Sequence, residues 1–113
     1  MIVLCYRVAP IITGLPKVEL IGHQDDVYAV AYLPNNTQVV TGDADGAIIL
    51  WDVNTGIEIR RFGPKVGKDG VGHDDIVYDI AVSPDGTRLL SASADGNVLL
   101  WDLGTGALLG EYK

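Results

Sequence analysis

The sequence has few of the residues that mark a disulfide framework, a membrane span or a helical protein. Its one cysteine, Cys5, has no partner within the chain, and a lone thiol suits a reducing compartment, so we expect a cytoplasmic protein. The chain has no uninterrupted apolar run of ~18 residues, the length that a membrane-spanning helix needs. Glutamate, the better helix former of the two acidic residues, occurs only three times among 15 carboxylates. We therefore expect little helix and no membrane span.

The net charge and the turn-forming residues further limit the class of protein and its partners. The net charge is -7, which repels phosphate groups and makes nucleic acid and anionic membranes poor partners. At 48% hydrophobic residues the chain is too apolar for an acidic disordered segment. Its 14 glycines and many aspartates predict numerous tight turns in a folded domain.

The sequence repeats itself at a spacing of 50 residues. Residues 22–63 align with residues 72–113 without a gap, and 16 of the 42 aligned pairs are identical. A match of this length predicts two copies of one structural unit. The predicted division is an apolar segment at 1–17 that forms a strand at an edge or of a preceding unit, a first unit at 18–62, an inserted loop at 63–71 and a second unit at 72–113.

Each unit is expected to contain four short strands. In the first unit, turn signals separate four stretches, which are residues 27–32, 37–41, 47–52 and 57–62. Asp45-Gly46 is the strongest of these signals, because such a pair favours a tight hairpin turn. The third strand is apolar on both faces and must be covered on both, whereas the fourth alternates and has one wet face. Four-stranded sheets packed on one another have this pattern.

Two pairs of residues in each unit resemble the signature of the WD40 repeat family. Gly22-His23 precedes Trp51-Asp52 in the first unit, and Gly72-His73 precedes Trp101-Asp102 in the second. Two complete patterns in register make the resemblance specific, and it covers nearly the whole chain from residue 18 onward.

This resemblance implies an all-β fold of β-propeller blades, here two four-stranded antiparallel sheets of an incomplete propeller. It also implies an interaction scaffold, not an enzyme and without a cofactor, that binds a protein partner through top-face and rim loops. Self-association or additional blades are needed to close a ring. Two alternatives stay open: a fragment of a larger regulatory or signalling protein whose activity lies elsewhere, or a propeller enzyme.

The resemblance further implies a buried network of a histidine, a hydroxyl, an aspartate and a tryptophan in each repeat. The chemistry agrees, because buried indole and imidazole groups need partners and a carboxylate accepts several hydrogen bonds. The hydroxyl of the second repeat is either Ser91 or Ser93. In the first repeat Thr41 aligns with Ser91, but Asp43 stands where Ser93 stands, which is expected to place two carboxylates near one imidazole. The network residues are His23, Thr41, Asp43, Asp45 and Trp51, and His73, Ser91, Ser93, Asp95 and Trp101.

No pattern indicates a metal centre or a catalytic group. The two histidines recur at one repeat position, as structural residues do, and residues 43–46 lack the further ligands of a calcium loop. Acidic residues and tyrosines after the Gly-His pairs suit a partner with a basic surface, and two lysines lie in the inserted loop. The candidate partner-binding residues are Asp25, Asp26, Tyr28, Lys65, Lys68, Asp74, Asp75 and Tyr78. The alternatives are solvated turns and an ordinary surface loop.

Overall fold

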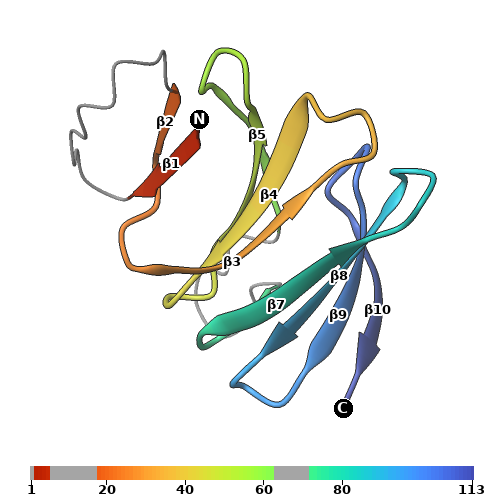
Figure 1. Cartoon of the computed structure of the whole chain (residues 1–113). Helices are drawn as coiled ribbons and strands as arrows, with labels where there is room; N and C mark the ends of the chain where they lie inside the picture. The colour runs from red at the N-terminus through yellow and green to blue at the C-terminus, as the bar shows by residue number, and fades with distance from the viewer. Residues whose placement is uncertain (1, 6–17, 63–71) are drawn as a thin grey trace.

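The fold consists of short β-strands joined by tight turns. The structure, a computed structural model, describes residues 2–5, 18–62 and 72–113. Its strands are β1 (Ile2–Cys5), β2 (Val18–Ile21), β3 (Val27–Tyr32), β4 (Gln38–Asp43), β5 (Ile48–Asp52), β6 (Glu58–Arg61), β7 (Val77–Val82), β8 (Arg88–Ser93), β9 (Val98–Asp102) and β10 (Leu108–Tyr112). Figure 1 shows them as two twisted sheets with a short strand pair beside the first.

Each repeat forms one four-stranded antiparallel sheet, so the predicted all-β fold is confirmed. The first sheet has the order β3-β4-β5-β6 and the second the order β7-β8-β9-β10. The turns explain the strand ends. Gly46 and Gly96 have φ angles of 90° and 89°, which glycine adopts without steric cost, and each reverses the chain between the second and third strands of its sheet.

The segment before the first sheet pairs differently. β1 lies beside β2 in parallel, with Ile2 opposite Val18 and Cys5 opposite Ile21, whereas the strands within both sheets are antiparallel. Residues 6–17 and the inserted loop at 63–71 lie outside the described residues, and the expectations for them stay predictions.

The first sheet is covered on both faces. On one face, β3 and β4 contact β7 of the second sheet, and Phe62 packs edge-on against Trp101 with ring centroids 6.0 Å apart. On the other face, Leu20 of β2 joins a buried cluster with Ile49 and Trp51. Two-sided cover is what the apolar third strand required.

The outer strand β6 departs from simple alternation. Its register with β5 shifts between Leu50 and Trp51, which leaves Ile59 out of the pairing and exposed. Arg60 instead turns toward the second sheet, where its guanidinium donates a hydrogen bond to the carbonyl oxygen of Leu103 at 3.0 Å. The β-bulge therefore sets which side chain of this strand joins the two repeats.

Candidate functional site

A line of buried hydrogen bonds in the second repeat ties the connection before β7 to β8, β9 and their turn. Trp101 Nε1 donates to Ser91 Oγ at 2.9 Å, Ser91 Oγ bonds to His73 Nε2 at 2.7 Å, and His73 Nδ1 bonds to Asp95 Oδ2 at 3.0 Å. The indole of Trp101 donates to Ser91, and because a carboxylate can only accept, His73 Nδ1 donates to Asp95. In the neutral ring, His73 Nε2 then accepts the hydroxyl proton of Ser91.

Ser93 lies outside that line, so Ser91 supplies the hydroxyl. The Ser93 hydroxyl donates to the carbonyl oxygen of Asp75 at 3.1 Å and accepts from the backbone N–H of Asp95, also at 3.1 Å. Ser93 therefore links the turn between β8 and β9 to the segment before β7 that carries Asp74 and Asp75. The two hydroxyls that the sequence left as alternatives therefore have separate tasks.

Asp95 is held as a carboxylate by its hydrogen bonds. Burial alone would raise its pKa, but N–H groups of the Asp74 and Asn97 backbone and the ring of His73 all donate to it. Together these donors outweigh burial and lower the pKa of Asp95.

The first repeat builds the same line with one different residue. Trp51 Nε1 donates to Thr41 Oγ1 at 2.7 Å, and Thr41 bonds to His23 Nε2. The carboxylate that meets His23 Nδ1, at 2.7 Å, belongs to Asp43, and both side chains are only 1% exposed. The remaining oxygen of Asp43 accepts the backbone N–H groups of Asp45 and Ala47, each at 2.9 Å.

Asp43 thereby accepts hydrogen bonds both from the histidine and from the turn backbone, whereas in the second repeat two residues share these bonds. There, Ser93 accepts from the backbone N–H of Asp95, and Asp95 accepts from the backbone N–H of Asn97 and from the histidine. Asp43 stands two residues before the position that aligns with Asp95, yet both carboxylates bond to Nδ1 of the histidine in their own repeat.

The assignment of Asp45 to the buried network is therefore wrong. Asp43 already occupies the place beside His23 Nδ1, and the side chain of Asp45 is exposed. Partial desolvation and the charges of Asp25 and Asp43 raise the pKa of Asp45. The two carboxylates expected near one imidazole are thus replaced by one buried carboxylate and one surface carboxylate.

Contacts between loops bring the acidic segments of both repeats to one edge. A Cβ atom on Gly46 would lie 2.5 Å from the carbonyl oxygen of His73 and 3.2 Å from that of Asp75, so the first turn touches the second connection. Asp45 in the same turn lies close enough to Asp25 for the charge of Asp25 to help raise its pKa. We call this surface the acidic edge, and its residues are Asp25, Asp26, Asp45, Asp74 and Asp75.

The two candidate tyrosines border the acidic edge. Tyr28 and Tyr78 are exposed near the start of β3 and β7, each where the register with the next strand shifts. The equivalent bulges give both tyrosines equivalent positions. Lys65 and Lys68 lie outside the described residues.

The described residues form no metal cluster, and their buried polar atoms are paired. Within residues 2–5, 18–62 and 72–113, no group of three or more His, Cys, Asp or Glu side chains is placed to hold a metal ion. Every buried side-chain nitrogen and oxygen atom in these ranges has a hydrogen-bond partner. None of these ranges forms a helix long and apolar enough to cross a membrane.

Comparisons with known proteins agree with this geometry. A family model described as "WD domain, G-beta repeat" matches residues 14–52 and 67–102. ASTRA-associated protein 1 of Pyricularia oryzae is 47% identical over 38 residues, which are 34% of this chain and 8% of that protein. This chain therefore spans only a small part of that relative.

Two solved structures share the fold over most of this chain. The structure of U3-55K has a TM-score of 0.76 and 28% identity, over 83% of this chain and 28% of the other. That of the RRP9 WD40 repeats has a TM-score of 0.75 and 26% identity, over the same shares of the two chains. With two repeats matched by the family model and their sheets shared with known WD40 structures, this chain belongs to the WD40 repeat family.

Proposed function

We propose that the chain is a non-catalytic interaction scaffold that binds a protein partner with a basic surface along its acidic edge. The observation that carries the proposal is the meeting of three acidic segments from both repeats, fixed by the contact of Gly46 with the backbone of His73 and Asp75. Neither repeat alone presents this arrangement.

The buried networks support a scaffold function. They use both histidines in hydrogen bonds to neighbouring side chains and anchor the connections that carry the acidic residues. A satisfied polar network makes its surroundings rigid. A rigid surface loses less conformational entropy on binding and so favours association.

The chemistry of the surface supports a basic partner. After partial desolvation, repulsion from the charge of Asp25 is the next largest cause of the raised pKa of Asp45. A lysine or arginine from a partner would relieve this repulsion, while exposed Tyr28 and Tyr78 offer apolar contact area beside it. The name of the relative, ASTRA-associated protein 1, also describes a protein that associates with others.

An array of synthetic peptides that differ in lysine and arginine content tests the proposal. The wild-type chain is expected to select basic peptides, and to do so less strongly as salt is raised. A variant with Asp25, Asp26, Asp74 and Asp75 changed to asparagine should lose the selection, because asparagine keeps the turn hydrogen bonds but removes the charge. The control is Asp85→Asn, an exposed charge at the turn that follows β7. Equal binding of acidic and basic peptides, or selection unchanged in the fourfold variant, would contradict the proposal.

A further inference from the structure

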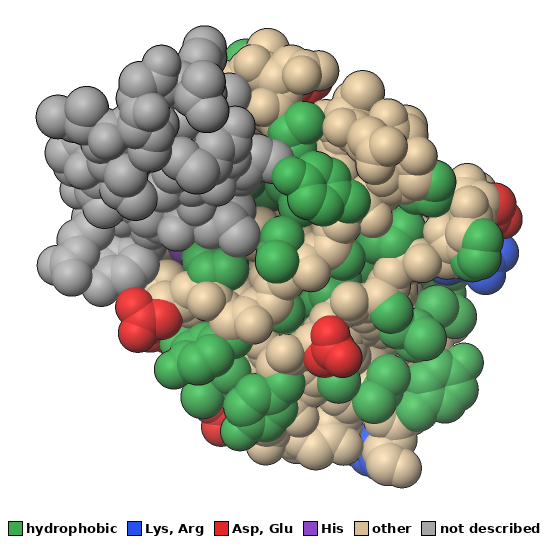
Figure 2. Space-filling model, viewed as in Figure 1, with side chains coloured by type: hydrophobic (Ala, Val, Ile, Leu, Met, Phe, Trp, Pro, Cys, Tyr) green, Lys and Arg blue, Asp and Glu red, His purple; other side chains and the backbone are tan. Residues whose placement is uncertain are grey.

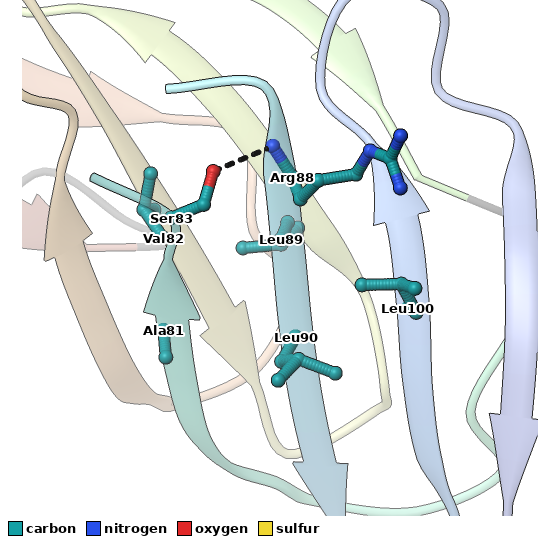
Figure 3. A pocket seen from close by; sticks show the side chains of 7 residues that line it. All are labelled: Ala81, Val82, Ser83, Arg88, Leu89, Leu90 and Leu100. Carbon is teal, nitrogen blue, oxygen red and sulfur yellow. Dashed lines mark hydrogen bonds between the residues drawn. The ribbon is translucent and has the colours of Figure 1, made fainter. Parts of the chain in front are cut away.

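Exposed hydrophobic side chains occupy two kinds of position in this chain. In Figure 2 they gather over the region of β3 and β7–β10. Leu90 and Leu100, with Ala81, line a hollow of about 310 Å³ on the second sheet (Figure 3). The 50-residue alignment pairs Leu90, which is 41% exposed, with Val40, which is fully buried where the two sheets pack. The hollow is therefore a surface for packing between repeats and does not indicate a ligand.

Tyr28 and Tyr78 are of the other kind, because their shared position is exposed in both repeats. The first sheet has the second sheet as the neighbour that follows it, and Tyr28 of the first sheet is still 55% exposed. The second sheet has the first as the neighbour that precedes it, and Tyr78 is still 59% exposed. A ring directed at either neighbour would be buried in one of the two repeats. The exposure of the tyrosine therefore does not depend on which neighbour a sheet has.

The backbone holds both tyrosines in the same way. Each is the residue that a β-bulge near the start of β3 or β7 leaves without a partner on the next strand. In the first repeat, the carbonyl oxygen of Asp26 accepts a hydrogen bond from the backbone N–H of Ala44 at 2.8 Å. In the second repeat, the carbonyl oxygen of Ile76 accepts one from the backbone N–H of Ala94 at 2.9 Å. A tyrosine on a backbone fixed in this way has only two side-chain torsions left to restrict when it binds.

The two rings lie close to carboxylates of the acidic edge. β3 and β7 are neighbouring strands, so equivalent positions near their starts bring Tyr28 and Tyr78 to the same end of the two sheets (Figure 1). Asp26 is two residues before Tyr28, and Asp75 is three residues before Tyr78. Two or three residues span at most ~11 Å between Cα atoms. The end of the sheets that carries the rings therefore also carries the negative charge of the proposed binding surface.

We infer that this surface selects arginine over lysine in its partner, and that the rings of Tyr28 and Tyr78 determine the choice. A guanidinium group is planar, so one face can stack on an aromatic ring while the N–H groups in its plane donate to a carboxylate. An ammonium group is compact and strongly hydrated, and it has no flat face to stack. It therefore gains from the carboxylates but less from the rings. The inference rests on the proposed function for the basic partner and adds which basic residue is bound.

Two peptides of equal length and charge test the inference, one with arginine and the other with lysine at every basic position. By fluorescence anisotropy of the labelled peptides, the wild-type chain should bind the arginine peptide with a Kd about threefold lower, which is the order of one exposed cation–π contact. A double variant with Tyr28→Leu and Tyr78→Leu should bind the two peptides equally, because leucine is apolar but has no aromatic face. A double variant with Tyr28→Phe and Tyr78→Phe should keep the preference, because the rings remain.

A second aligned pair of hydrophobic side chains that is exposed in both repeats provides the control. Ile59 and Leu109 lie on the outer strands β6 and β10, and changing both to alanine should leave the ratio of the two Kd values unchanged. Equal wild-type affinity for the arginine and lysine peptides, with weaker binding of a neutral serine peptide, would overturn the inference and leave the proposed function standing. A preference for arginine that persists in the double leucine variant would also overturn it. Binding of neither basic peptide would refute the proposed function and the inference together.

Discussion

The sharpest test of the buried networks is a crossed set of substitutions at aligned positions. Asp43 aligns with Ser93, and Asp45 aligns with Asp95, but the carboxylates that meet the histidines are those of Asp43 and Asp95. Substitution by alanine should therefore lower the free energy of unfolding strongly at Asp43 and Asp95, and only slightly at Asp45 and Ser93. If aligned residues had the same role, alanine at Asp45 and alanine at Asp95 would destabilise the chain equally.

The contacts set the magnitudes. Removing the Asp43 carboxylate leaves the buried ring of His23 and the backbone N–H groups of Asp45 and Ala47 without their acceptor. A buried donor left without its acceptor costs about 1–3 kcal/mol, so the loss of an acceptor shared by three donors should cost about 3 kcal/mol or more. Ser93→Ala removes neutral hydrogen bonds at a partly exposed site and should cost about 1 kcal/mol. An exposed side chain such as Asp45 changes stability by roughly 0.5 kcal/mol or less.

An exchange keeps the test informative if Asp43→Ala fails to fold. Asp43→Ser gives the first repeat the Ser-Ala-Asp-Gly turn of the second, so Asp45 should move in beside His23 as Asp95 does beside His73. Asp43→Ser should therefore cost less than Asp43→Ala. Adding Asp45→Ala to Asp43→Ser should then cost about 3 kcal/mol, because buried donors would again lose their acceptor, although Asp45→Ala alone costs little.

Urea unfolding followed by tryptophan fluorescence measures these differences, since Trp51 and Trp101 each belong to one network. Two results would refute the reasoning. One is a cost for Asp45→Ala in the wild-type chain as large as that for Asp95→Ala. The other is strict additivity of Asp43→Ser and Asp45→Ala, because the exchange of carboxylates requires that the two positions interact.

Two further predictions concern the turn that joins the repeats. Asp45→Asn should stabilise the chain at neutral pH by about 0.5 kcal/mol, because exposed like charges repel weakly. The folded-state pKa of Asp45 is raised, so its ionisation opposes folding; the advantage of the variant should grow as pH rises above 3.8 and vanish below it in pH-dependent thermal unfolding. Gly46→Ala should destabilise the chain more than Gly96→Ala: both have positive φ, but only the Cβ at residue 46 would strike the carbonyl of His73. Equal unfolding midpoints for the two alanine variants would contradict a close contact between the repeats at Gly46.

Most of the fold could be predicted from the sequence because the repeat and the turns are local signals. The 50-residue period and the Asp45-Gly46 and Asp95-Gly96 pairs mark where the chain reverses. The boundaries of the strands then follow within two residues. The two-sided apolar strands also indicated that each sheet needs a neighbour on both faces, and the first sheet has one on each.

The details of the site escaped prediction because they depend on distances across the fold. Alignment matches positions along the chain, whereas His23 Nδ1 donates to the carboxylate that lies within hydrogen-bond distance, which is that of Asp43. The parallel pairing of β1 with β2 and the bulge at Ile59 likewise follow from packing and leave no local pattern in the residues. The sequence indicated the acidic residues beside each Gly-His pair but not that they meet. Nothing in it places the β4–β5 turn at Gly46 against the segment that precedes β7.

The buried network of the second repeat bears on the surface proposed to bind a partner. In repeat proteins each unit is stabilised by its own contacts and by its interfaces with neighbours. Among the described residues the second sheet packs against another sheet on one face, so the hydrogen bonds among His73, Ser91, Asp95 and Trp101 carry a larger share of its stability. Those bonds also fix the connection that bears Asp74 and Asp75, two of the five residues of the acidic edge. Weakening the network should therefore disturb the surface proposed to bind a partner.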